Sequence, residues 1–162
     1  LLTTELRKEA KARGRQTIDV NPTGWPARNQ KVTIKDGTNV YNGWFWNRSH
    51  MIADSLGGDP IKENLVTGTR TQNVGIDPSH TGGMAYTETK ARNYLDDPSH
   101  KNCPLYYAVT PNYEGDELIP RTVTVDMESC DQSISEHVTV YNTAKGWAID
   151  YNTGEIHQIS GN

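Results

Sequence analysis

Two periods of apolar residues run along the chain, and they predict helices in some stretches and strands in others. Near the N-terminus the apolar residues recur at every fourth position: Leu2, Leu6 and Ala10. This spacing predicts a helix that begins at Thr3 or Thr4 and runs to about Arg13, with Gly14 as its stop. The charged face of this helix carries Arg7, Lys8, Lys11 and Arg13. We interpret that face as solvated, with a phosphate contact as the alternative.

Strict alternation of apolar and polar residues follows and predicts a β-hairpin. Every second residue is apolar in a strand expected at residues 31–35, and an Asp-Gly pair at residues 36–37 is a strong turn signal. The chain is expected to return as a partner strand over residues 38–46. The polar residues 47–50 then lie at a corner between this strand and a short helical segment.

A second helix is predicted over residues 84–95. Met84, Ala91 and Leu95 share one face of it by their i, i+7 and i+11 spacing, and Glu88 falls on the same face. A carboxylate on an inward-facing stripe either reaches a partner or serves a site. The alternative is that Glu88 bends out at the edge of the stripe.

The second half of the chain has the period of antiparallel strands. The alternating apolar residues are Leu105, Tyr107 and Val109, then Val123, Val125 and Met127, then Val138 and Val140. Residues 146–150 and 155–160 flank a predicted tight turn at residues 151–154. Because no repeat or linker interrupts the chain, we predict one α+β domain over residues 1–162.

Composition is consistent with a small core that is rich in amphipathic aromatic residues. Apolar residues make up 34% of the 162 residues, with four Trp and eight Tyr but a single Phe. No stretch approaches the roughly 18 apolar residues of a membrane span, so no membrane association is expected. The chain starts without Met, a basic segment or an apolar segment, and we expect that any targeting sequence has been removed.

The net charge of −4 hides an uneven distribution. Residues 1–50 carry nine Lys and Arg against four Asp and Glu, whereas the remainder carries seven against sixteen. A cationic face could bind a polyanion in spite of the acidic total, because the local field decides binding. Ordinary scatter of surface charge is the alternative.

The two cysteines, Cys103 and Cys130, both fall in the β-rich half. A bridge between them would close a loop of about 28 residues, which is worth about 3–4 kcal/mol in the chain-entropy model. We predict this disulfide and, from it, a secreted protein; two buried free thiols are the alternative. Two cysteines without a histidine at finger spacing do not form a zinc site.

Among the five histidines, His50 has the most unusual neighbours, because it ends a polar run that follows three aromatic residues. A neutral imidazole, with a pKa of about 6.5, can take a proton from water near neutral pH. Arg48 could hold a phosphate oxygen and stabilise negative charge in the transition state. His50 is therefore a candidate general base, although a single histidine is more often structural.

A second polar stretch, residues 68–75, contains Asn73. An amide oxygen is a hard, neutral ligand that suits Mg²⁺, an ion that keeps most of its waters and takes few protein ligands. Glu88 could then hold a water of the metal, and the metal would act as a Lewis acid. The alternative is that Asn73 is a turn residue. We expect His50 and Asn73 to meet in space.

Three stretches resemble the DNA/RNA non-specific endonuclease family and, within it, the streptodornase-type secreted DNases of Gram-positive bacteria. They are residues 47–58 (NRSHMIADSLGG), 64–75 (NLVTGTRTQNVG) and 82–95 (GGMAYTETKARNYL). The resemblance extends over roughly residues 20–97. It implies a ββα-metal core, also called a His-Me finger, with a mainly antiparallel β-sheet flanked by helices.

The resemblance also implies roles for individual residues. The general base of the family's D-R-G-H quartet corresponds to His50, and the metal-binding Asn corresponds to Asn73. Arg48 matches the family's Arg before the base, and Glu88 matches its helical Glu. The N-R-S-H form of the quartet in this chain is shared with the streptodornase branch.

The function that we predict is a secreted, Mg²⁺-dependent endonuclease that cleaves DNA, with RNA as an alternative substrate and Mn²⁺ as an alternative metal. The resemblance implies 5′-phosphate products. No base-reading motif occurs, which predicts low sequence specificity, and no obligate protein partner is expected. The nearest candidates for contacts with the nucleic-acid backbone are Arg70, Arg28 and Lys31.

Two other functions stay open at this point. The chain could be the nuclease domain of an antibacterial toxin, which would use the same residues and require an immunity protein. It could also be a non-catalytic β-rich module that stacks exposed Trp and Tyr residues on sugars or bases.

Overall fold

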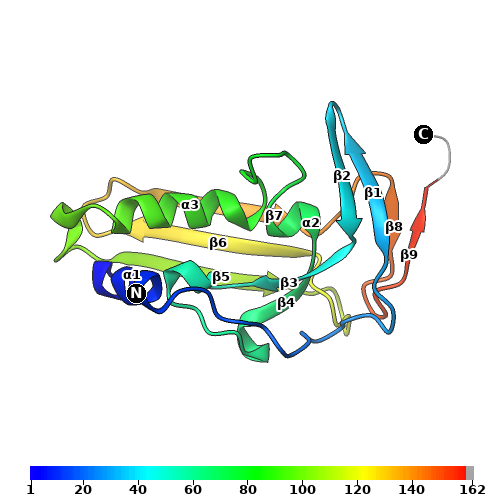
Figure 1. The fold of residues 1–162 in the computed structure, drawn as a ribbon, viewed down its shortest axis with the longest axis horizontal. Helices are drawn as coiled ribbons and strands as arrows, with labels where there is room; N and C mark the ends of the chain where they lie inside the picture. The colour runs from blue at the N-terminus through cyan, green and yellow to red at the C-terminus, as the bar shows by residue number, and fades with distance from the viewer. Residues whose placement is uncertain (160–162) are drawn as a thin grey trace.

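The structure, a computed structural model, describes residues 1–159 and is shown in Figure 1. In chain order the elements are α1 (Thr4–Arg13), β1 (Lys31–Asp36), β2 (Asn39–Trp44), β3 (Trp46–His50), η1 (Asp54–Leu56), η2 (Lys62–Asn64), β4 (Leu65–Thr69), α2 (Arg70–Asn73), α3 (Met84–Leu95), η3 (Pro98–His100), β5 (Leu105–Asn112), β6 (Thr122–Ser129), β7 (Ser135–Tyr141), β8 (Trp147–Ile149) and β9 (Ile156–Gln158). The η elements are single 3₁₀ turns.

The first helix, α1, has the bounds that its sequence predicts. The Thr3 hydroxyl accepts a hydrogen bond from the Leu6 amide at 3.2 Å, so it satisfies one of the amides left free at a helix start. Gly14 ends the helix with φ 77°, a value that favours glycine. Leu2 exchanges two backbone hydrogen bonds with Leu105, each 2.8 Å, and these bonds fasten the start of α1 to β5.

The three-stranded sheet β5-β6-β7 is antiparallel throughout, which confirms the pattern expected for the second half of the chain. Helix α3 lies along this sheet, close to β6 in Figure 1. One core cluster joins helix and sheet and includes Met84, Ala91, Leu95, Val123, Val125 and Met127. The alternating apolar residues of the strands and the predicted stripe of α3 therefore face the same core.

The hairpin of β1 and β2 is present, but its turn is formed by residues 37–38, one residue later than the expected Asp-Gly pair, and the return strand ends earlier than predicted. We expected one strand through Trp46; instead β2 stops at Trp44 and β3 begins at Trp46. The reason is Asn29, whose side chain accepts a hydrogen bond from the Trp46 amide and donates one to its carbonyl. Phe45, the residue at this break, is fully buried.

After the break, β3 pairs with β4 in a separate antiparallel ribbon. The polar run that we placed at a strand-to-helix corner is therefore itself a strand, and His50 is its last residue. β4 leads directly into the single turn α2, where the Thr69 hydroxyl accepts a hydrogen bond from the Gln72 amide. The polar stretch around Asn73 is thus the end of a strand followed by a short helix.

The start of α3 is packed tightly against α2. Gly83 has φ 55°, and a Cβ atom at this position would lie 2.2 Å from the Gln72 carbonyl oxygen and 2.4 Å from that of Thr71. Only glycine permits this approach. The contact fixes α3 relative to α2 and places Glu88, about one turn further on, near the end of α2.

The remaining predictions concern the C-terminal part. β8 and β9 form the predicted antiparallel pair around residues 151–154, and Ser160 of the expected strand lies outside the described residues. The disulfide between Cys103 and Cys130 is present as predicted.

Within residues 1–159 no helix is long and apolar enough to cross a membrane. That the whole chain forms one domain stays a prediction.

Candidate active site

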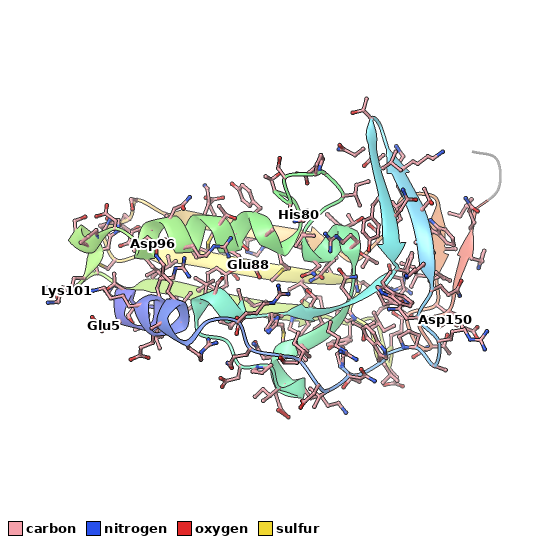
Figure 2. All side chains as sticks on the ribbon, viewed as in Figure 1. Glu5, His80, Glu88, Asp96, Lys101 and Asp150 are labelled. Carbon is pink, nitrogen blue, oxygen red and sulfur yellow. A yellow bond between two sulfur atoms is a disulfide. The ribbon has the colours of Figure 1, made fainter. Side chains whose placement is uncertain are left out.

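A cavity of about 810 Å³ lies between α1, the segment that follows α1, β3 and α3. It is lined by Arg48, His50, Asn73 and Glu88, the four side chains that the sequence predicted as one site. Figure 2 shows Glu88 on the side of α3 that faces the strands and α1. The expected meeting of His50 and Asn73 at one site is therefore present, although they come from β3 and α2.

His50 is half-buried, and its Nε2 atom is buried without a hydrogen-bond partner among the described residues. Burial lowers the pKa of His50 because it disfavours the charged imidazolium. The carboxylate of Asp54 raises this pKa, and the guanidinium of Arg15 lowers it. The net decrease keeps the imidazole neutral near pH 7, with a free nitrogen that can accept a proton.

Asn73, the last residue of α2, is held by two side chains of β3. Its Oδ1 accepts a hydrogen bond from the Ser49 hydroxyl at 3.2 Å, and its Nδ2 donates one to Asn47 Oδ1 at 3.2 Å. These contacts attach the end of α2 to the strand that carries His50. The interpretation of Asn73 as a plain turn residue does not account for these two bonds.

The carboxyl group of Glu88 is buried, and burial disfavours its ionised form. Burial raises its pKa to about 8, and only the nearby charge of Arg92 acts in the opposite direction. No hydrogen bond from the described residues lowers this pKa. An ionised carboxylate at this position is therefore compensated only in part, by the charge of Arg92.

The donor set of the cavity fits a divalent cation of the Mg²⁺ type. In residues 1–159 no group of three or more His, Cys, Asp and Glu side chains is placed to hold a metal. The cavity offers the Asn73 amide oxygen and the buried Glu88 carboxyl group. Mg²⁺ prefers a few oxygen ligands and retains water, which matches this sparse set.

Arg48 lies at the cavity, with its guanidinium anchored on the segment between α1 and β1. Its Nε donates to Asn21 Oδ1 at 3.0 Å and its Nη1 to the Ile18 carbonyl at 3.4 Å. The guanidinium carbon lies 5.4 Å from the ring centre of Trp25. These contacts fix the group in place, and it stays exposed to the cavity.

Comparison with known proteins identifies the family. Residues 8–131 match the family model of the DNA/RNA non-specific endonucleases. The chain belongs to this family. A deoxyribonuclease of Streptococcus dysgalactiae subsp. equisimilis is 41% identical over 116 residues, which cover 72% of this chain and 34% of that protein. The chain thus spans about a third of the length of this relative.

Two solved structures of streptodornase-like nucleases share the fold. The Sda1 nuclease with a bound zinc ion superposes with a TM-score of 0.85 at 35% identity, over 97% of this chain and 74% of that one. NucA from Streptococcus agalactiae with a bound magnesium ion gives 0.69 at 27% identity, over 90% and 65%. The α+β fold with a ββα-metal core is thereby confirmed.

Three cations that we predicted as backbone contacts of this family member do not line the cavity. Arg70 lies next to His80, with Nη2 and Nε2 3.1 Å apart, and its guanidinium covers the Tyr41 ring. Lys31 lies over Trp44, 5.1 Å from the ring centre, and Arg28 is exposed elsewhere. Their contact with nucleic acid stays a prediction for surfaces outside the cavity.

The solvated interpretation of the α1 charges is wrong for Arg7. Its side chain is only 12% exposed, because Nε bonds to Asp96 at 2.9 Å and Nη1 to the Ser55 carbonyl. Arg13 pairs with Asp54 at 3.0 Å. The distant partners Asp96 and Asp54 could not be assigned from the helical period alone.

Sequence reasoning also missed Arg15, which lies just beyond α1 and lines the cavity. It is exposed, and its charge reaches His50 strongly enough to lower the pKa of the imidazole. The excess of Lys and Arg in residues 1–50 was the signal that could have drawn attention to it. The position of one cation within that excess required the fold.

Proposed function

We propose that this protein is a secreted, divalent-metal-dependent endonuclease that hydrolyses DNA phosphodiester bonds without sequence specificity. The observation that carries the proposal is one cavity lined by His50, whose Nε2 has no partner among the described residues, by the amide of Asn73 and by the buried carboxyl group of Glu88. One proton acceptor and two oxygen donors around one space are the components of metal-assisted phosphodiester hydrolysis.

His50 serves as the general base. Its Nε2 takes a proton from the water that attacks the phosphorus in line with the departing 3′ oxygen, and the product carries a 5′-phosphate. The lowered pKa keeps this nitrogen free of a proton near pH 7, and the absence of a partner among the described residues leaves its lone pair available.

Asn73 is the residue that would hold the metal, which we propose to be Mg²⁺ with Mn²⁺ as an alternative. A divalent cation bound there would stabilise the negative charge that develops on the phosphate and on the leaving oxygen. Asn73 offers its amide oxygen directly. Glu88, on the facing helix, accepts a hydrogen bond from water in the site and balances positive charge.

Arg48 and Arg15 supply the positive charge that binds the substrate phosphates. Arg48 approaches the cavity from the strand of His50 and Arg15 from the segment after α1. The anchored guanidinium of Arg48 needs little reorganisation when charge increases in the transition state, which favours catalysis. Because these contacts involve phosphates, binding should be salt-sensitive and independent of base sequence.

The relatives support DNA as the substrate and a divalent ion as the cofactor. The curated relative is named a deoxyribonuclease, and the two solved neighbours hold a zinc ion and a magnesium ion. RNA is an alternative substrate of the same chemistry. The disulfide is consistent with an oxidising compartment and supports secretion.

Plasmid DNA incubated with the purified protein in Mg²⁺ or in EDTA tests the proposal. We expect cleavage in Mg²⁺, none in EDTA, and a loss of cleavage at low Mg²⁺ in Asn73→Ala. Asn93→Ala, at an exposed position on α3 outside the cavity lining, is the matched control and should retain activity. If the wild-type protein binds DNA without metal-dependent cleavage, the chain is a binding module and the proposal is wrong.

A further inference from the structure

The two residues by which the quartet of this chain departs from the D-R-G-H form, Asn47 and Ser49, both contact Asn73. Alternation along β3 turns Asn47 and Ser49 to the face that carries α2. Ser49 is fully buried and donates to Asn73 Oδ1, while Asn47 accepts from Asn73 Nδ2. Both polar ends of the Asn73 amide are therefore occupied by this strand.

The orientation of the Asn73 amide follows from the contacts of Asn47. The Asn47 Nδ2 donates to the Trp44 carbonyl at 3.5 Å, so its Oδ1 is the end that faces Asn73. Asn73 must then present its NH₂ group to Asn47 and its oxygen to the Ser49 hydroxyl. A flipped amide would place two NH₂ or two oxygen groups against each other at one of these contacts.

The packing around this pair leaves little freedom. Gly68 lies opposite Asn47 in the ribbon, and a Cβ there would be 2.9 Å from the Ser49 Cβ and 2.2 Å from Gln72 Oε1. The backbone of β4 therefore lies close to Ser49 and to the Gln72 side chain, and a side chain at position 68 would displace one of them.

We propose that Asn47 and Ser49 are positioning residues that fix the amide plane of Asn73, so that the second lone pair of its Oδ1 is directed at the cavity. The inference rests on the proposed function, because it assigns a metal to that oxygen. An amide oxygen has two lone pairs; the Ser49 hydroxyl uses one, and the other remains for a cation. Groups that orient a metal ligand typically change metal affinity by about 10–100-fold when removed.

Metal binding without DNA tests this role, with Mn²⁺ as the probe and the paramagnetic signal of free Mn²⁺ as the readout. We expect Ser49→Ala and Asn47→Ala each to raise the Mn²⁺ dissociation constant about 10-fold. Asn47→Asp should stay within about 3-fold of the wild type or bind more tightly, because a carboxylate still accepts from the Asn73 NH₂ group. Asn93→Ala is the matched control and should not change binding.

Kinetics separate positioning from general damage. For Ser49→Ala and Asn47→Ala, the Mg²⁺ concentration for half-maximal cleavage should rise about 10-fold, while kcat at saturating Mg²⁺ stays within about 3-fold. Rescue by Asn47→Asp but not by Asn47→Ala is the signature that a merely structural role would not give. Thermal unfolding of each variant verifies that binding is measured on folded protein.

Two failures can be told apart. A wild-type protein that neither binds Mn²⁺ nor cleaves DNA overturns the proposed function itself. A wild-type protein that does both, with Asn47→Ala and Ser49→Ala binding Mn²⁺ as tightly as it does, overturns only the positioning role.

Discussion

Successive side chains of β3 lie on opposite faces of the strand, and the two faces have different environments. On one face, Asn47 and Ser49 are hydrogen-bonded to Asn73, and Ser49 is fully buried. On the other face, His50 keeps a buried nitrogen without a partner among the described residues, and Glu88 across the cavity gains no hydrogen bond that would lower its pKa. The polar groups of one face are hydrogen-bonded within the protein, whereas on the other face His50 Nε2 has no partner among the described residues.

The difference shows how a five-residue strand serves both folding and chemistry. A period of two separates neighbouring residues onto opposite faces, so a buried polar network and a reactive group can share one short segment. Buried polar groups without partners cost stability, and proteins retain them where a substrate or cation provides the missing contact. The comparison therefore predicts that changes on the cavity side alter activity more than stability.

The largest expected effect is on the cavity side. His50→Ala should lower kcat by about 10²–10⁴-fold, the contribution typical of general base catalysis. Its unfolding temperature should stay close to that of the wild type, because His50 Nε2 gives up no hydrogen bond. Plasmid cleavage and thermal unfolding measure both effects. The exposed His157→Ala is the control, and a large loss of stability in His50→Ala would contradict the comparison.

A change remote from β3 should have the reverse effect: it should lower stability and leave activity unchanged. Replacing Cys103 and Cys130 together by Ser should lower the free energy of unfolding by about 3–4 kcal/mol, because the disulfide restricts the unfolded chain. The bridge lies at the start of β5 and the end of β6, and neither cysteine lines the cavity. Chemical denaturation gives the stability, and kcat under native conditions should be unchanged. A drop in kcat would mean that the two regions are coupled.

Glu88 tests how much stability the protein loses by burying an ionisable carboxyl group at the cavity. In the metal-free protein, Glu88→Gln should raise the free energy of unfolding by about 1–3 kcal/mol at pH 9 and by little at pH 5. The carboxyl ionises near pH 4.5 in the unfolded chain and near pH 8 in the folded one, so ionisation increasingly disfavours the folded state between these values. Urea unfolding in EDTA measures the difference, with the exposed Glu155→Gln as control. A gain that is independent of pH would contradict the assignment.

The smallest expected effects concern the charges around His50. Because its pKa is lowered, the acidic limb of kcat/KM should lie below pH 6.5. Arg15→Gln removes a positive charge and should move this limb upward by about 0.3–0.5 pH units, whereas Asp54→Asn should move it downward by a similar amount. A pH profile at constant ionic strength measures both shifts. Two shifts in the same direction would mean that His50 is not the titrating group.

Much of the fold could be predicted because its signals are local. The helix from Thr4 to Arg13 has both its cap and its stop in sequence, and the hairpin of β1 and β2 and the alternation in β5, β6 and β7 are equally direct. The break at Phe45 was not predictable in this way. It depends on Asn29, which lies 17 positions before Trp46 in the chain and contacts it only in the folded state.

The residues of the candidate site also form two groups, those that the sequence identified and those that it did not. The polar runs around His50 and Asn73, and Glu88 on an apolar stripe, identified the chemically active residues from sequence, because such residues conflict with their apolar surroundings. The partners of the Lys and Arg side chains could not be assigned from the sequence, because the spacing of charged residues does not indicate which distant residue each one contacts. Arg7 and Arg15 both line the cavity, but Arg7 is paired with Asp96, whereas Arg15 is exposed.

The sequence by itself determined which side chains can react and which segments carry them, since periodicity and residue chemistry are written along the chain. Only the tertiary structure decided which of them share a space. The close approach of α3 to α2 at Gly83 and the pairing of β3 with β4 bring Glu88, His50 and Asn73 to one cavity. Packing between distant segments sets these distances, and no local pattern contains them.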